Sequence, residues 1–191
     1  GRGESDVEDV PDSAVAVLIQ TGRFRATRQI LPTDRLDTVT ICVPTPLRKT
    51  RDPDLSYIVS ATETVKAHLR PGMLVILEST TYPGTTQEIV QSILEESGLQ
   101  AGTDFFLAFS PERVDPGNEK WHTRNVPKVV GCLTSDCTEL AATLYRAAID
   151  HVVTVSSPRT AEMVKLLENT FRAINIGLVN EMALMCDRIG I

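Results

Sequence analysis

The fold class follows from residues 73–98, which read MLVILESTTYPGTTQEIVQSILEESG. The first five residues form a short apolar run that is typical of a buried strand in a parallel sheet. A hydroxyl-rich turn with a Pro-Gly pair comes next. From Thr85 to Ser97 apolar residues recur at helical spacing until Gly98, a common helix end. The stretch therefore predicts a strand, a turn and a helix in succession.

The same alternation extends in both directions along the chain. Apolar runs predict further strands at residues 39–43, 105–109, 128–132 and 151–155, and helical patterns lie at 55–69 and 135–148. Strands and helices in regular alternation imply crossover connections and a parallel sheet covered on both faces. We therefore expect an α/β fold.

The C-terminal part of the sequence predicts one long helix, which begins at Ser157-Pro158 and runs to about Arg188. After position 170 this helix is apolar on nearly every side, which favours burial between two domains or two subunits. The chain stops at Ile191 without a clear domain end. We therefore expect a truncated sequence.

Composition and charge exclude several classes of protein. The 191 residues are 42% hydrophobic and 23% charged with a net charge of −6, which is ordinary for a globular protein of one domain or slightly more. No basic run is present, so we expect no nucleic-acid partner and no membrane partner. No apolar stretch approaches the roughly 18 residues of a membrane span.

Cysteine and histidine usage argues against metal and disulfide chemistry. The four cysteines are scattered at positions 42, 132, 137 and 186, without the paired spacing of a zinc site. His68, His122 and His151 share no metal spacing either, so we expect no metal. Free and mostly buried thiols indicate a reducing cytoplasm.

Neither a G-x-G-x-x-G turn nor a P-loop occurs, so the sequence alone shows no dinucleotide site. Three turns nevertheless follow predicted strands, at the edge where open parallel sheets bind ligands. They are VPTP at 43–46, ESTTYPGTT at 78–86 and FSPERVDPGN at 109–118. The first is either a ligand loop or a stiff turn. The second is either an anion site at a helix N-terminus or a richly capped helix start.

The third turn and the long helix carry candidate catalytic groups. Glu112 is a candidate proton acceptor and Arg113 a candidate ligand for a phosphate or carboxylate; the alternative is a surface turn with a local ion pair. Lys165 and Asn169 are spaced to clamp a developing oxyanion; the alternative is a stripe that faces solvent. That polar stripe comprises Glu162, Lys165, Asn169 and Arg172.

Taken in order, several spaced motifs resemble the family of UDP-glucose, UDP-N-acetylglucosamine and GDP-mannose dehydrogenases. The resemblance covers essentially the whole chain. The motifs are GES at 3–5, EDVP at 8–11, VPTP at 43–46, EST at 78–80, PGTT at 83–86, FSPERVDPGN at 109–118, PKVVG at 127–131, AEMVKLLENTFRA at 161–173 and Asn180-Glu181.

The resemblance implies how the chain is organised. Residues 1–155 are expected to form a partial NAD-binding Rossmann-like domain that lacks its first βαβ part. Residues 156–191 are expected to form a long central helix that leads into a missing second domain. The expected fold is thus an incomplete Rossmann-like parallel sheet followed by a long central helix. The expected protein partner is a second copy, joined through the 158–188 helix.

The resemblance also implies residue roles on the cofactor side. Val43, Pro44 and Thr45 look like cofactor-binding loop residues. Thr80 resembles a threonine that touches the nicotinamide region of NAD and helps to order a catalytic water. We therefore expect NAD as the cofactor and Thr80 as one of the catalytic residues.

On the substrate side, Glu112 resembles the glutamate that handles protons or positions water in the substrate loop. Arg113 and Val114 follow it in that loop as expected substrate-binding residues. Lys165 and Asn169 resemble the pair that stabilises the oxyanion and positions the substrate. The expected substrate-binding residues are thus Glu112, Arg113, Val114, Lys165 and Asn169. Of these, Glu112, Lys165 and Asn169 are also expected to be catalytic, together with Thr80.

The implied reaction oxidises the 6-hydroxyl of a nucleotide sugar to a carboxylate in two hydride transfers, which consume two NAD. A cysteine captures the aldehyde, and water cleaves the resulting thioester. In the family that cysteine lies beyond Ile191, and Cys132 stands where a second glycine is frequent. We therefore expect the chain alone to show no turnover.

The PERVDPGN loop at 111–118 resembles the N-acetylhexosamine branch of the family. It favours UDP-N-acetylglucosamine as the substrate. UDP-glucose, UDP-N-acetylmannosamine and GDP-mannose are the alternatives. A noncatalytic dimerisation or binding piece is the alternative from another functional class.

Overall fold

The computed structural model describes residues 4–5, 10–31, 34–50, 52–113 and 123–191. The chain divides into two compact units, Gly1–Arg35 and Leu36–Ile191. The first unit contains the helix α1 (Asp12–Gln20), which buries none of its residues. Val17 and Leu18 are among its exposed apolar side chains. The sequence analysis did not predict this helix.

The second unit is built on a five-stranded sheet in the order β1-β2-β3-β4-β5. Each strand lies within two residues of its expected position. The α/β fold is therefore confirmed. The strands are β1 (Thr38–Ile41), β2 (Leu74–Leu77), β3 (Phe106–Phe109), β4 (Lys128–Cys132) and β5 (Val152–Val155).

The sheet is mixed rather than wholly parallel. β1, β2 and β3 pair in parallel and β4 pairs with β5 in parallel, but β3 and β4 are antiparallel. Each parallel pair is joined through a helix, whereas the described residues between β3 and β4 include none. An antiparallel pair needs no crossover helix between its strands. The expectation of a parallel sheet is wrong for this one pair.

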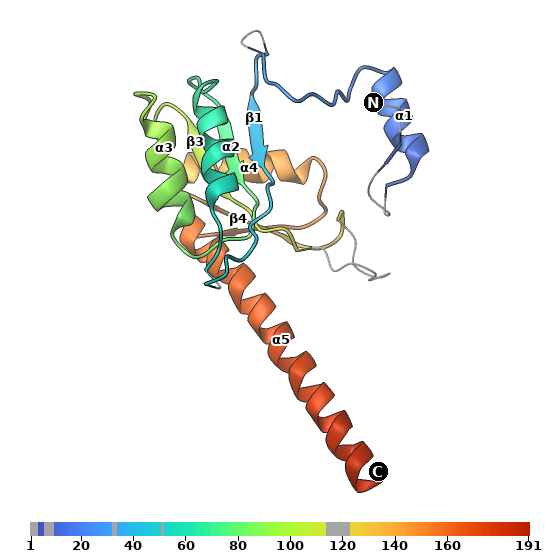
Figure 1. Ribbon diagram of the computed structural model, residues 1–191. Coiled ribbons are helices and arrows are strands. Elements are labelled where there is room, and N and C mark those ends of the chain that lie inside the picture. The colour runs from blue at the N-terminus through green and yellow to red at the C-terminus, as the bar shows by residue number, and fades with distance from the viewer. Residues whose placement is uncertain (1–3, 6–9, 32–33, 51, 114–122) are drawn as a thin grey trace. The chain divides into compact units, whose positions relative to one another are not determined.

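Helices cover both faces of the sheet (Figure 1). One face packs against α2 (Ser56–Lys66), against the π-helical η1 (Thr86–Gln91) with its continuation α3 (Ser92–Glu95), and against the start of α5 (Pro158–Ile189). The other face packs against α4 (Ser135–Arg146). The expected coverage of both faces is thus confirmed.

The helix α5 has 32 residues and extends away from the sheet after its first turns (Figure 1). The Ser157 hydroxyl caps its start by accepting a hydrogen bond from the Thr160 N–H at 3.1 Å, and the left-handed Gly190 closes its end. The apolar side chains of its second half are exposed in the single chain: Phe171, Ile174, Ile176, Leu178, Val179, Met182, Leu184, Met185 and Ile189.

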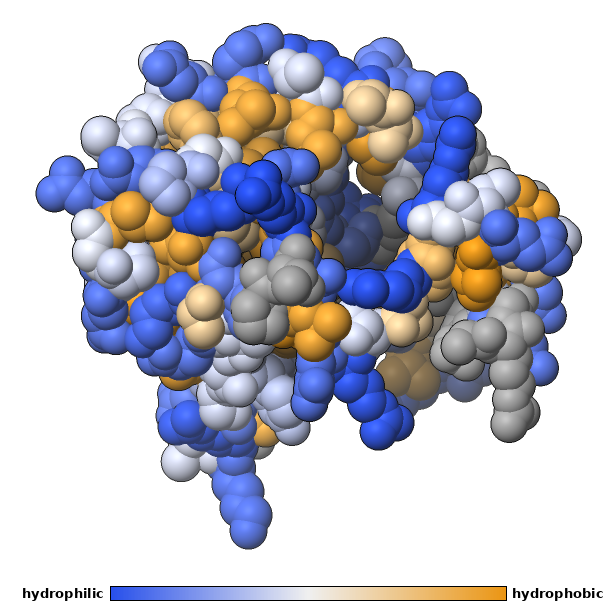
Figure 2. Space-filling view, turned by 90° about the horizontal axis from the view of Figure 1, so that it is seen from above, coloured by the Kyte–Doolittle hydropathy of each residue, from blue (hydrophilic) through white to orange (hydrophobic). Residues whose placement is uncertain are grey.

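The surface mixes polar and apolar residues. Seen from above, hydrophilic residues surround smaller hydrophobic patches (Figure 2), which is usual because a folded protein leaves much apolar area exposed. The helix α5 is continuous, but charged residues such as Lys165, Arg172 and Glu181 interrupt its apolar sequence. Within the described part of the chain, no helix is both long and apolar enough to cross a membrane.

Candidate functional site

Three loops leave the sheet at one edge. The strand register pairs Ile41 with Leu77 and Leu77 with Phe109, so the segments that begin at residues 42, 78 and 110 start side by side. These segments contain the first two turns that the sequence analysis selected and the described part of the third, residues 110–113. Because open α/β sheets bind ligands at the carboxyl ends of their parallel strands, this edge is the candidate site.

Ser79 joins the first two loops. Its buried hydroxyl accepts a hydrogen bond from the Val43 N–H at 2.8 Å and donates one to the Ile41 carbonyl oxygen at 3.3 Å. The first loop is thereby held against the turn that carries Thr80. The expected cofactor-side residues all lie in these two loops, half-buried or exposed: Val43, Pro44, Thr45 and Thr80.

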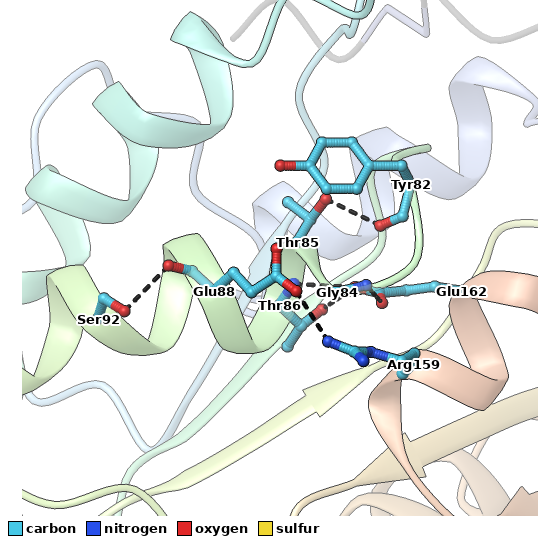
Figure 3. Close-up of polar contacts among 8 residues, drawn as sticks. All are labelled: Tyr82, Gly84, Thr85, Thr86, Glu88, Ser92, Arg159 and Glu162. Atoms are coloured by element: carbon cyan, nitrogen blue, oxygen red, sulfur yellow. Dashed lines mark hydrogen bonds and ion pairs between the residues drawn. The ribbon is translucent and has the colours of Figure 1, made fainter.

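The helix start after the second turn is occupied by a carboxylate of the protein itself (Figure 3). Glu162 of α5 is fully buried and accepts hydrogen bonds from the backbone N–H groups of Gly84 and Thr86 and from the Thr86 hydroxyl. The richly capped helix start is therefore the correct alternative for residues 84–86. The exposed Thr80 side chain lies outside this cap.

Arg113 anchors the third loop to α5. Its guanidinium donates two hydrogen bonds to the Glu168 carboxylate, one of them from Nε at 3.0 Å, and a third to the Pro127 carbonyl oxygen at 2.5 Å. The pair is not the local ion pair of a surface turn, because Glu168 lies 55 residues further along the chain. The contact of Arg113 with substrate stays a prediction. Val114 lies outside the described residues.

Lys165 joins α5 to the same loop at a second point. Its half-buried ammonium donates a hydrogen bond to the backbone carbonyl oxygen of Glu112, whose side chain is exposed. The structure thus brings together two of the expected catalytic residues. Asn169 lies one turn further along α5 and is exposed. The stripe is not a uniform solvent-facing surface, because its first member, Glu162, is buried.

A polar cluster that the sequence reasoning missed lies at the same edge, on the side of α4. We name it the Glu78 cluster, and it comprises Glu78, Lys128, Tyr145 and Cys42. The Glu78 carboxylate accepts a hydrogen bond from the Tyr145 hydroxyl, lies 3.0 Å from the Lys128 ammonium and lies 3.8 Å from the Cys42 thiol. The Lys128 ammonium also lies 5.0 Å from the centroid of the Tyr145 ring. Only one indication of this cluster is present in the sequence: Glu78 directly follows the apolar strand β2, and Lys128 begins the apolar strand β4.

The Glu78 cluster raises two pKa values. Desolvation raises the pKa of the Tyr145 phenol, and the negative charge of Glu78 raises it further. The same two causes, in the same order, raise the pKa of the Cys42 thiol. Cys42 is therefore protonated near neutral pH and is not an activated nucleophile.

The other cysteines lie away from this edge. All four thiols are free, and those of Cys132 and Cys137 are buried. A hydrogen bond with Cys137, together with burial, raises the pKa of Cys132. The Cys137 thiol in turn donates to the Leu107 carbonyl oxygen at 3.2 Å. Among the residues that the structure describes, no group of three potential ligands is placed to hold a metal ion.

Comparison with families of known proteins gives two matches. Residues 2–149 match the NAD binding domain of the UDP-glucose/GDP-mannose dehydrogenase family. Residues 159–191 match the central domain of the same family. The first match alone covers more than half of the chain.

Individual relatives match over most of this chain. The UDP-N-acetyl-D-mannosamine dehydrogenase of Pyrococcus horikoshii is 37% identical over 97% of this chain and 44% of its own length. The UDP-N-acetyl-D-glucosamine 6-dehydrogenase of Pseudomonas aeruginosa is 41% identical over 79% of this chain and 36% of its own length. The solved structure of UDP-D-ManNAc dehydrogenase from Pyrococcus horikoshii, 37% identical, has a TM-score of 0.90 and covers 98% of this chain and 45% of that chain. The chain thus spans less than half the length of these relatives.

Proposed function

We propose, because this chain belongs to the UDP-glucose/GDP-mannose dehydrogenase family, that the protein oxidises the 6-hydroxyl of a UDP-N-acetylhexosamine to the uronic acid with NAD. The observation that carries the proposal is the hydrogen bond from Lys165 to the Glu112 carbonyl oxygen. This contact brings an ammonium group of the long helix beside the loop that follows β3. An ammonium ion at such an edge lowers the energy of a developing oxyanion.

Each predicted residue has a role in this proposal. Lys165 and Asn169 stabilise negative charge on the substrate oxygen and position the sugar. Glu112 holds or moves a proton, or orders a water. Thr80 orders the catalytic water at the nicotinamide side. Arg113 and Val114, which follow Glu112 in the sequence, are proposed to bind the substrate.

The residues present fit one part of an NAD site. Thr45 and Thr80 carry hydroxyl groups at the carboxyl edge, and Ser79 fixes the loop between them through the Val43 N–H. Bound NAD would accept the hydride; Val43, Pro44 and Thr45 would bind the cofactor, and Thr80 would contact its nicotinamide region. The glycine-rich turn that holds a pyrophosphate is absent from the sequence. We therefore assign residues 1–155 to a partial NAD-binding domain and 156–191 to the central helix.

The substrate class is supported by the names of the relatives. Two of them are named for UDP-N-acetyl-D-mannosamine and UDP-N-acetyl-D-glucosamine. The PERVDPGN loop favours UDP-N-acetylglucosamine, and UDP-N-acetylmannosamine, UDP-glucose and GDP-mannose are alternatives that one assay separates. The four free cysteines suit a reducing compartment, so we place the reaction in the cytoplasm.

The exposed half of α5 supports a homodimer. Phe171, Val179 and Leu178 are 70%, 65% and 58% exposed in the single chain. Contiguous apolar surface of this kind marks an interaction site in soluble proteins. We propose that a second copy covers it through residues 158–188. Light scattering tests this, with a dimer mass as the expected result and a monomer mass as the contrary one.

The function is tested by NADH formation with the full gene product, including any segments encoded beyond this chain. We expect turnover with UDP-N-acetylglucosamine above the three other nucleotide sugars. Lys165→Met should lower kcat by about 100-fold or more. Glu139→Gln, which changes an exposed carboxylate on α4, is the matched control and should stay within about twofold of wild type.

Two results would overturn this function. One is the absence of NADH formation with all four nucleotide sugars, and the other is full activity of Lys165→Met. A dimer that binds a UDP-sugar without turnover would instead favour the noncatalytic binding role.

A further inference from the structure

Glu162 is a buried carboxylate that joins the long helix to the turn after β2 (Figure 3). It receives the Thr86 N–H at 2.9 Å, the Thr86 hydroxyl at 2.6 Å and the Gly84 N–H. Both carboxylate oxygens act as acceptors. In the described part of the chain no basic side chain pairs with Glu162. The N-terminus of the helix formed by η1 and α3 faces its charge instead.

The turn that Glu162 holds is internally tied. The Thr81 hydroxyl donates to the Thr85 hydroxyl, which donates to the Tyr82 carbonyl oxygen at 2.9 Å. Gly84 has a φ of +114°, and a Cβ there would stand 2.6 Å from Oε1 of Glu88. Residues 81–86 therefore form a compact unit directly after Thr80. If this unit moves relative to α5, Thr80 moves with it, because Thr80 directly precedes residue 81.

On α5, Glu162 and Lys165 are neighbours on the helix surface because they are three residues apart. Glu162 bonds to the turn after β2, and Lys165 bonds to the Glu112 carbonyl oxygen in the loop after β3. One turn of helix thus contacts both loops that carry expected catalytic residues. Arg159 adds an outer link to Glu88 at 2.8 Å, but both of these side chains are more than half exposed.

We propose that Glu162 is a positioning residue for the oxidation: its carboxylate fixes the distance between Lys165 and the Thr80 turn. The inference rests on the proposed function of Lys165. Burying a carboxylate carries a desolvation cost that its hydrogen bonds at best offset, so we explain the presence of Glu162 by the geometry it fixes rather than by a gain in stability. The buried carboxylate therefore acts through Lys165 and not on the substrate itself.

The test is a double-mutant cycle in the full gene product. Glu162→Gln keeps the shape of the side chain but turns an amide N–H toward donors that need an acceptor. We expect kcat to fall about tenfold or more, with KM for either substrate changed less than about threefold, because the reacting groups are misplaced while binding persists. In a Lys165→Met background the same change should have almost no further effect on kcat.

A milder variant guards against loss of folding. Thr86→Val removes one hydrogen bond to Glu162 and leaves both backbone bonds, so we expect a smaller loss of kcat in the same direction. Amide exchange of residues 79–90 should become faster in both variants, and the Glu139→Gln control should match wild type in every assay.

Three outcomes decide the inference. An unchanged kcat in Glu162→Gln would overturn it. So would an equal loss of kcat with and without Lys165, because that is the behaviour of a residue with a structural role only. If the wild type forms no NADH with any nucleotide sugar, the proposed function is overturned, and the inference that rests on it is overturned too. This outcome is distinct from the first two, because in both of those the wild type is active.

Discussion

Gly131 of β4 and Ser157, the residue that caps α5, approach each other backbone to backbone. A Cβ at residue 131 would stand 2.1 Å from the carbonyl oxygen of Ser157 and 2.7 Å from its carbonyl carbon. Neither atom belongs to a side chain that can turn away. This close approach seats the start of α5 on the sheet, and with it Glu162 and Lys165.

Gly131→Ala should therefore be strongly destabilising. We expect a loss of about 2–4 kcal/mol in the free energy of unfolding, because β4 and α5 must separate to admit the methyl group. Urea denaturation followed by circular dichroism measures it. Gly177→Ala is the matched control, since a Cβ there meets nothing within 4 Å; it should be neutral or stabilising by up to about 1 kcal/mol. Equal stability of the two variants would contradict the prediction.

The Glu78 cluster predicts the reactivity of Cys42. Desolvation and the Glu78 carboxylate hold the pKa of this thiol above its usual value. Removing the negative charge in Glu78→Gln should lower that pKa and increase the thiolate fraction at pH 8. We expect alkylation of Cys42 by iodoacetamide to become about threefold faster or more.

Cys186 serves as the internal reference for that measurement, and Glu88→Gln as the matched substitution remote from Cys42. Peptide mass spectrometry resolves the two sites. A Cys42 rate that is unchanged or slower in Glu78→Gln would show that Glu78 does not control the thiol.

The pair Arg113–Glu168 predicts how firmly the third loop is held. Arg113→Lys keeps the charge but loses the paired hydrogen bonds to Glu168, because an ammonium group cannot form the fork of a guanidinium. We expect amide exchange in residues 110–113 to become about threefold faster or more. Arg48→Lys, at the more exposed pair with Asp54, should change nothing measurable. Unchanged exchange at 110–113 would show that other contacts hold the loop.

Periodicity predicted the strands and helices of the second unit because most of them place apolar side chains in the core; β2, for example, is buried at every position. The sequence analysis missed the helix α1. This helix buries none of its residues, and its N-cap residue, Pro11, forms no capping hydrogen bond through its side chain. The direction of β4 was also beyond periodicity, because an apolar run reads the same in either direction. Its reversal is what brings Lys128 to the carboxyl edge beside Glu78.

The candidate site was only partly predictable for the same reason. Spacing along α5 indicated that Glu162 and Lys165 share a face, but the partners of Glu162 lie 76 and 78 residues away. A contact of that range depends on the tertiary fold and leaves no local pattern. The resemblance supplied roles for Lys165 and Glu112, and the structure added the contact between them.

The pKa of Tyr145 predicts a dependence of stability on pH. Burial and the Glu78 carboxylate raise this pKa in the folded state, whereas an unfolded tyrosine titrates near pH 10. The stabilising contribution of the neutral phenol is therefore fully present below about pH 10 and is lost as pH rises toward the folded pKa. At pH 8, Tyr145→Phe should cost about 1 kcal/mol through the lost hydrogen bond to Glu78. The difference from wild type should shrink at pH 11, because only the wild type loses stability by ionising this residue. Denaturation at both pH values measures it, with Tyr57→Phe as the control for loss of an exposed phenol; a difference that grows with pH would refute the assignment.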